Sequence, residues 1–358
     1  MPSTIAPLRV LVTGANGFIA SHTIERLLAA GYHVTGTVRD PGSEAKTAHL
    51  RAMPGAEDRL TLVAADLTGP DPFSEHTDVD VVMHMASPYA VDVDDPQRDL
   101  VDPAVRGTRA ALEAAGSSRV RRVVLTSSMA AITDEPDGRV LTEDDWNEAS
   151  SLTRNPYYHS KTLAERAAWE FVEQEKPGFD LAVINPFLVV GPSHTKAINA
   201  SNQILVDILK GAYPAVMDLD WGFVDVRDVA DAHVAAMDPA VPQGRYIAAS
   251  GNMTMTEVVA LMRAEGYGRA EGYGHAKLPR LSLSGGFGTA LMKLASHTQR
   301  KGVGSYLRTH LGRHPRFDNA RAREVLGIDF RPPADSIRDT LADLTRWGHA
   351  PQPRGRAA

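Results

Sequence analysis

Residues 12–20 read VTGANGFIA and place two glycines between an apolar run and a helix-like run. The preceding segment, 8–12, is short, apolar and β-branched, which predicts a buried strand. The following segment, 18–30, has apolar residues at helical spacing, and Gly31 stands where a helix-ending glycine belongs. The quoted stretch therefore joins a predicted strand to a predicted helix.

The glycines in this turn fit a dinucleotide site. The first, Gly14, permits a tight turn, and the second, Gly17, lets the backbone approach a pyrophosphate. The small residue Ala20 lets helix and strand pack closely, while the phosphates meet free N–H groups at the helix start. A plain strand-to-helix turn is the alternative. The second strand predicted at 33–38, directly after the helix, favours the dinucleotide site.

Strand-like and helix-like segments alternate through the first half of the chain. Short strands that are apolar on both faces are typical of a parallel sheet covered by helices on both sides, so we expect an α/β fold, a doubly wound sheet of the Rossmann type. Further strands are predicted at 60–65, 79–85, 120–126 and 181–184, and helices notably at 105–115 and 156–175.

The alternation weakens after about residue 190, where strand signals become few. This change predicts a smaller C-terminal lobe that binds substrate. The expected division is 1–190 for the dinucleotide-binding domain, with a returning segment near 221–250, and 191–220 with 251–350 for the lobe. The Pro- and Arg-rich tail, 351–358, is expected to be disordered.

Composition narrows the function classes. The chain has 358 residues and a net charge of −6, which argues against nucleic acid as a partner because phosphates need a basic face. It contains no cysteine, which excludes disulfides and thiolate metal sites, and its 13 histidines show no metal-ligand spacing, so we expect no metal. No secretory signal or membrane-spanning segment is visible, so we expect a cytoplasmic monomer or homodimer that acts on a small molecule.

The end of the second predicted strand indicates which dinucleotide binds. NAD sites place an acid there for the ribose hydroxyls, whereas NADP sites use arginine for the 2′-phosphate. Val38 occupies this position, with Arg39 next and Lys46 across the turn. Asp40 is the competing residue for an NAD site, but its place before Pro41 makes it a better turn residue. We therefore predict NADP(H), with Arg39 and Lys46 as solvated surface charges in the alternative interpretation.

A second motif, NPYYHSK at residues 155–161, opens the predicted helix 156–175. Tyr157 and Lys161 are four residues apart and project from one helical face. A phenol has a pKa near 10, and a neighbouring ammonium lowers that pKa by stabilising the phenolate. The pair can thus act as acid and base at neutral pH. An ordinary amphipathic helix start is the alternative, and Tyr158 is the local rival, expected to pack on another side.

A third polar group is expected at a strand end, where open α/β sheets bind ligands. The segment 123–128 ends in Thr126, Ser127 and Ser128. A serine hydroxyl there could donate a hydrogen bond to a substrate carbonyl and hold it against Tyr157. Ordinary turn residues are the alternative interpretation for each hydroxyl.

Eight ordered motifs spread over roughly residues 8–345 resemble the extended short-chain dehydrogenase/reductases. Within that family they are similar to the branch of dihydroflavonol reductases, cinnamoyl-CoA reductases and microbial aldehyde and methylglyoxal reductases. The motifs are TGANGFIA (13–20), TVRDP (37–41), AADL (64–67), HMASP (84–88), TSS (126–128), YYHSK (157–161), INPFLVVGP (184–192) and FVDVRDVADAH (223–233).

The resemblance implies roles for individual residues. Ser128 matches the catalytic serine, Tyr157 the acid/base tyrosine, and Lys161 the lysine that also binds the nicotinamide ribose. The expected cofactor-binding set is Gly14, Asn16, Gly17, Phe18, Ile19, Arg39, Lys46, Asp66, Leu67, Ala86, Ser87, Thr126, Tyr157, Lys161, Asn185, Pro186 and Val189.

Substrate contacts are expected from the loop after Ser128, the segment after Pro192 and the lobe. Thr133 stands where dihydroflavonol reductases carry a substrate-choosing asparagine, which argues against a flavonoid substrate. The candidates suggest a mostly apolar cavity for a hydrophobic or aromatic carbonyl compound. They are Met129, Thr133, Phe187, Ser193, Asn199, Gln203 and Trp221.

These observations predict an NADPH-dependent carbonyl reductase that converts an aldehyde or ketone reversibly to the alcohol, with Ser128, Tyr157 and Lys161 as catalytic residues. A nucleotide-sugar epimerase or dehydratase and a 3β-hydroxysteroid dehydrogenase-like enzyme use the same triad and remain alternatives. A non-catalytic NADP-binding regulator is the alternative from another class, but it has no need of the Tyr157–Lys161 pair.

Overall fold

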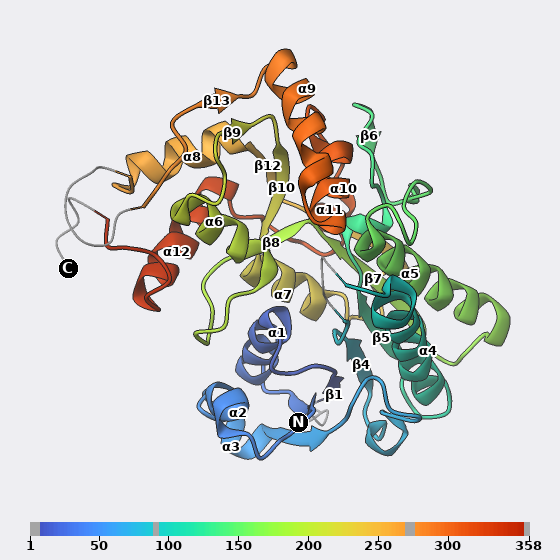
Figure 1. The fold of residues 1–358 in the computed structure, drawn as a ribbon. Coiled ribbons are helices and arrows are strands. Elements are labelled where there is room, and N and C mark those ends of the chain that lie inside the picture. The colour runs from blue at the N-terminus through green and yellow to red at the C-terminus, as the bar shows by residue number, and fades with distance from the viewer. Residues whose placement is uncertain (1–7, 89–92, 269–275, 354–358) are drawn as a thin grey trace.

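The computed structural model describes residues 8–88, 93–268 and 276–353. Its centre is a seven-stranded sheet in the order β11-β7-β5-β4-β1-β2-β3, and every neighbouring pair is parallel (Figure 1). These strands are β1 (Arg9–Val12), β2 (His33–Val38), β3 (Leu60–Ala64), β4 (Val81–His84), β5 (Arg122–Thr126), β7 (Asp180–Pro186) and β11 (Gly244–Ala248). The Rossmann-type fold class expected from the sequence is confirmed.

Helices cover both faces of this sheet. On one face α1 (Phe18–Ala29) packs against α7 (Val226–Ala235), and on the other α4 (Asp102–Gly116) packs against α5 (Pro156–Glu175). Alternate residues of a strand point to opposite faces. Accordingly Val10 and Val12 join the core beneath α1, whereas Leu11 joins the core beneath α5. Short helices α2 (Glu44–Arg51) and α3 (Ala56–Arg59) lie between β2 and β3.

The C-terminal part surrounds its own hydrophobic core, to which Leu205, Trp221, Met262 and Leu341 contribute. Its helices are α6 (Ala200–Lys210), α8 (Met255–Ala264), α9 (Gly286–Ala295), α10 (Lys301–His310) and α12 (Pro333–Arg346), whereas α11 (Ala320–Val325) packs against β11 of the central sheet. A three-stranded sheet joins β8 (Leu188–Val190), β10 (Asp220–Asp225) and β12 (Gly251–Thr254). The strand β9 (Val216–Met217) pairs with β13 (Ser282–Leu283), and β6 (Val140–Leu141), which follows β5 in the chain, pairs with β14 (Arg316–Phe317).

Several sequence expectations can be compared directly with these elements. The bounds of β2 and α5 coincide with the predicted 33–38 and 156–175. The segment near 221–250 divides: β10 belongs to the three-stranded sheet, while α7 and β11 return to the central sheet. The lobe also holds more strands than its sequence suggested. They were not predicted because each is only two to six residues long. The domain boundaries themselves stay a prediction, and residues 354–358 of the tail lie outside the described residues.

Within the described ranges, no helix combines the length and the apolar character needed to cross a bilayer.

Candidate functional site

The strand order creates a crevice between β1 and β4. The helix after β1 and the helix after β4 lie on opposite faces of the sheet, so the loops at the carboxyl ends of these strands separate. Thr13 connects the two loops, because its Oγ1 accepts hydrogen bonds from the backbone N–H groups of Met85 and Ala86, each at 3.0 Å. Gly14 has a φ of +68°, and a Cβ there would lie 3.1 Å from the Cα of Ala86. Position 14 therefore requires glycine.

The start of α1 is built like an anion-binding terminus. Gly17 is the N-cap of α1, and no side-chain hydrogen bond caps this end of the helix. A Cβ at Gly17 would come within 3.1 Å of the carbonyl oxygen of Gly14. Asn16 and Gly17 are exposed, and Phe18 and Ile19 open the first turn half-buried. Backbone N–H groups at an uncapped helix start bind phosphate groups well. This cradle fits a dinucleotide's pyrophosphate.

The predicted phosphate-binding residues and two further cofactor candidates, Asp66 and Leu67, lie around the ends of β2 and β3. Arg39 directly follows β2 and Lys46 lies in the first turn of α2, and both are exposed. Asp66 accepts hydrogen bonds from the backbone N–H and the hydroxyl of Thr68, and these bonds lower the pKa of its carboxyl group. Leu67 packs on Gly107 of α4, where a Cβ would overlap it.

Lys161 is a buried, strongly perturbed cationic group at this edge of the sheet. Its side chain lies in α5, is 8% exposed, and donates a hydrogen bond to Oγ of Ser87 at 3.1 Å. Burial lowers the pKa of the ammonium to about 8, and the nearby Glu165 opposes this shift. Tyr157 lies one turn earlier in the same helix and is half-buried. Through Lys161, this end of α5 is joined to the loop that also contains Ala86.

The three hydroxyls at the end of β5 have different surroundings. Oγ1 of Thr126 lies 2.7 Å from Nε2 of His233 in α7. Ser127 is buried and donates to Glu165. Ser128 is half-buried, and its Oγ accepts a hydrogen bond from the N–H of Ala130 at 3.1 Å. Accepting that bond leaves the hydroxyl proton of Ser128 available for a carbonyl oxygen.

A buried network behind Lys161 was missed by sequence reasoning. Glu165, one turn after Lys161, accepts hydrogen bonds from Asn185 at 2.7 Å, from Arg245 at 2.5 Å and from Ser127. Asn185 also donates to the carbonyl of Ser128 at 3.3 Å. The network therefore couples α5 to β5, β7 and β11. The spacing of Glu165 four residues after Lys161 was the available signal.

A second polar cluster holds the first turn of α5 and was also missed. The N-cap, Asn155, donates to Oγ1 of Thr309 at 2.9 Å and to Asp134, and its backbone N–H donates to Ser305 at 3.1 Å. Arg154 pairs with Asp134 at 3.0 Å. Because Ser305 and Thr309 belong to α10, this cluster connects the tyrosine end of α5 to the lobe.

The remaining cofactor and substrate candidates occupy varied positions. Pro186 ends β7 beside Ala248, and Val189 pairs with Val224 in the three-stranded sheet. Met129 and Trp221 are buried, 3% and 2% exposed, and the Trp221 indole N–H donates to the hydroxyl of Tyr306. The half-buried candidates are Thr133, Phe187, Ser193, Asn199 and Gln203. A shared pocket wall made by these residues stays a prediction.

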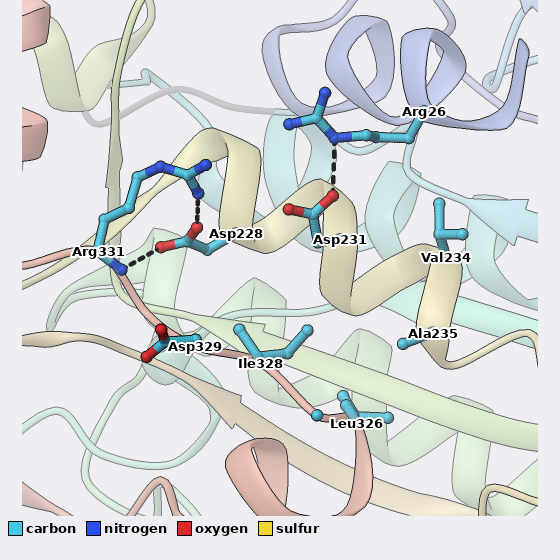
Figure 2. A pocket seen from close by; sticks show the side chains of 10 residues that line it. Arg26, Asp228, Asp231, Val234, Ala235, Leu326, Ile328, Asp329 and Arg331 are labelled. Carbon is cyan, nitrogen blue, oxygen red and sulfur yellow. Dashed lines mark hydrogen bonds and ion pairs between the residues drawn. The ribbon is translucent and has the colours of Figure 1, made fainter. Parts of the chain in front are cut away.

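A separate groove of about 690 Å³ lies between α1, α7 and the segment 326–331. Figure 2 shows two ion pairs along it, Arg331 with Asp228 and Arg26 with Asp231. None of Ser128, Tyr157 and Lys161 lines it. Four of its five charged lining groups neutralise one another, which leaves Asp329 as the source of its net charge.

Comparison with known proteins adds independent evidence. Cinnamoyl-CoA reductase 2 of Arabidopsis thaliana is 34% identical over 353 residues, covering 96% of this chain and 95% of that protein. Tetraketide alpha-pyrone reductase 1 of the same plant is 38% identical over 352 residues, covering 95% and 96%. The crystal structure of yeast methylglyoxal/isovaleraldehyde reductase Gre2 complexed with NADPH superposes with a TM-score of 0.76 at 29% identity, covering 96% of this chain and 100% of that one.

These relatives confirm the resemblance stated from the motifs. The matched family model extends over residues 10–249, from the second residue of β1 to the residue after β11, and thus reaches all seven strands of the central sheet. The chain belongs to the NAD dependent epimerase/dehydratase family.

Proposed function

We propose that this protein is an NADPH-dependent reductase that converts an aldehyde or ketone to the alcohol. The observation that carries the proposal is the buried Lys161, whose Nζ lies 3.1 Å from Ser87 beside the glycine turn, one helical turn from Tyr157. A buried ammonium is costly for folding. Its burial at the switch point of a parallel sheet, with a lowered pKa, supports a role in chemistry.

The described residues fit the dinucleotide. Gly14 and Gly17 clear space at the crevice, α1 presents its uncapped start, and Arg39 with Lys46 offers positive charge beyond β2 for a 2′-phosphate. The relatives named as reductases, one of them solved with NADPH, support the same choice of cofactor. When bound, NADPH supplies the hydride for the reduction.

In the proposed mechanism, Ser128 and Tyr157 donate hydrogen bonds to the carbonyl oxygen of the substrate. These bonds strengthen as negative charge develops on that oxygen, which lowers the barrier. Tyr157 then donates its proton to the oxygen, and the positive charge of Lys161 favours the phenolate that remains. Glu165 holds the surrounding side chains and is a positioning residue.

The substrate is proposed to be a hydrophobic or aromatic carbonyl compound. Met129 packs with Phe187 and Phe317 in an apolar cluster directly after Ser128, which supports an apolar wall near the reacting oxygen. The lobe, 191–220 with 251–350, is proposed to supply the remaining contacts.

The decisive experiment pairs two neighbouring tyrosines. Tyr157→Phe is expected to lower turnover by about 10²–10⁴-fold, the usual worth of general acid catalysis, with NADPH affinity changed little. Tyr158→Phe is the matched control, because the Tyr158 hydroxyl lies 3.4 Å from Nε2 of His310 in the lobe. Turnover is followed by NADPH absorbance over a panel of aldehydes and ketones.

Near-normal turnover of Tyr157→Phe would refute the mechanism. Tightly bound NAD in the purified protein, without consumption of NADPH, would instead favour a nucleotide-sugar epimerase or dehydratase. Binding of NADPH without turnover of any carbonyl compound would favour a regulator.

A further inference from the structure

Three side chains far from each other in the chain meet between α1 and the loop after β8. His22 and Glu25 lie in α1, and His194 lies in the loop that leads to α6. One ligand atom from each lies within 4.8 Å of the others, with 3.9 Å from His22 Nδ1 and 3.6 Å from His194 Nε2 to the same oxygen of Glu25. None of the three belongs to the site proposed for reduction.

Two of these ligand atoms are buried without a described hydrogen-bond partner. They are Nδ1 of His22, whose residue is only 4% exposed, and Nε2 of His194. An orphaned buried polar atom costs about 1–3 kcal/mol, so two facing one carboxylate require an explanation. A shared cation would satisfy both atoms.

The surroundings of His22 prepare its ring for a metal. Its other nitrogen, Nε2, lies 2.9 Å from the carbonyl oxygen of Pro192 and must donate to it, because a carbonyl only accepts. That bond assigns the proton of the neutral ring to Nε2 and leaves the lone pair of Nδ1 directed at Glu25. Metal-binding histidines are commonly held this way by a backbone carbonyl.

The partner loop is held in place independently. The backbone N–H of Ser193 donates to Asp343 of α12 at 2.8 Å, and Arg346 donates to the carbonyl of Ser193 at 3.2 Å. Arg26, 3.8 Å from Glu25, is the competing cation, but its Nε is held by Asp231 at 2.7 Å.

We propose that His22, Glu25 and His194 bind a divalent transition-metal ion of the zinc class. Two imidazoles and one carboxylate are a common zinc donor set, and a fourth position remains for water. Tetrahedral zinc needs its ligand atoms about 3.3 Å apart, so each histidine nitrogen must move closer to the Glu25 oxygen by several tenths of an ångström, and the two histidine nitrogens, now within 4.8 Å of each other, must reach the same spacing. Glu25 and His194, with side chains 38% and 24% exposed, have room to move. The bound ion would join the loop after β8 to the dinucleotide-binding helix. The absence of a metal site, expected from local histidine spacing, would then be wrong.

The test uses the full chain without an affinity tag, stripped with a chelator and titrated with zinc chloride by calorimetry. We expect one equivalent of zinc to bind and the thermal midpoint to rise, because an ion that binds the folded state stabilises it. His194→Ala and Glu25→Gln are each expected to weaken binding about tenfold or more. His33→Ala, which removes an exposed histidine, is the matched control and should leave the affinity unchanged.

Cobalt(II) provides a second readout that does not depend on enzyme activity. Substitution should give the visible ligand-field bands of a four-coordinate site, and these bands should be lost in His194→Ala and Glu25→Gln. No saturable binding, or equal affinities of His194→Ala and His33→Ala, would overturn the proposal. If one variant fails to fold, the other still decides, because the two ligands lie in different elements.

Discussion

The two residues that cap helix α5 share an uncommon left-handed backbone conformation, but one is buried and the other is exposed. Asn155, its N-cap, has a φ of 47°, and Lys176, its C-cap, has a φ of 46°. Residues other than glycine rarely adopt this left-handed backbone conformation, and asparagine does so more readily than most. Asn155 is buried and bonded to Asp134 and Thr309, whereas Lys176 is exposed and donates its backbone N–H to the carbonyl of Val172.

The comparison separates two reasons for a residue's identity. At Asn155 the side chain connects α5 to the loop after β5 and to the lobe, so both the conformation and the amide group matter. At Lys176 the backbone conformation alone matters, and glycine would serve better. The helix also contrasts two lysines, the buried Lys161 near its start and the exposed Lys176 at its end.

The largest expected effect is on turnover, and it should distinguish the two lysines when the charge of each is removed separately. Lys161→Met should lower turnover by about 10²–10⁴-fold, because the proposed proton transfer from Tyr157 loses the ammonium that supports it. Lys176→Met should leave turnover unchanged. Steady-state assays with NADPH and one accepted carbonyl compound measure both variants. Equal turnover of the two variants would show that the buried and the exposed lysine do not differ in their contribution to catalysis.

A smaller effect is expected from Asn155. Asn155→Ala should destabilise the protein by about 3 kcal/mol, because it leaves Thr309 and the buried Asp134 without an amide donor and adds the cost of a left-handed alanine. Asn155→Gly keeps the backbone conformation, so its loss should be about 1 kcal/mol less. Urea unfolding of both variants measures the difference. If the two variants were equally stable, backbone strain would contribute nothing at this end.

Burial of Lys161 predicts a dependence of stability on pH. Its pKa in the folded chain, about 8, lies below the ordinary lysine value of about 10.4, so the unfolded chain binds the proton more tightly. The loss of folding stability caused by the buried ammonium is complete below about pH 8 and disappears as the pH rises to about 10.4. Lys161→Met should therefore be more stable than the natural chain by about 3 kcal/mol near pH 7, and this gain should vanish near pH 10.4.

Urea unfolding without cofactor at several pH values measures this gain. Lys176→Met is the control, and its stability relative to the natural chain should be the same at every pH. A gain of Lys161→Met that did not change with pH would show that the buried ammonium is not its cause.

The smallest effect is expected at the exposed end. Lys176→Gly should stabilise the protein by about 1 kcal/mol, because glycine adopts the left-handed conformation without the steric cost of a Cβ. Turnover should be unaffected. A loss of stability in urea unfolding would mean that the Lys176 side chain contributes contacts at the end of the helix.

Residues adjacent in the chain were the most predictable part of the site. The glycine turn at 12–20, β2 and the Tyr157–Lys161 pair depend on local spacing, and the structure has each as a turn, strand or helical pair where expected. Glu165, Arg245 and Asn155 were not identified, because their partners come from distant segments. The short lobe strands escaped notice because two to six residues give too little periodicity to detect.

By itself, the sequence determined the parallel sheet, the glycine turn after β1 and the helical face that bears a tyrosine and a lysine, because hydrophobic period and glycine placement act over neighbouring residues. Only the tertiary structure decided which polar groups share an environment. The burial of Lys161, the amide bonds of Asn155 and the approach of His194 to His22 each depend on segments that chain folding alone brings together.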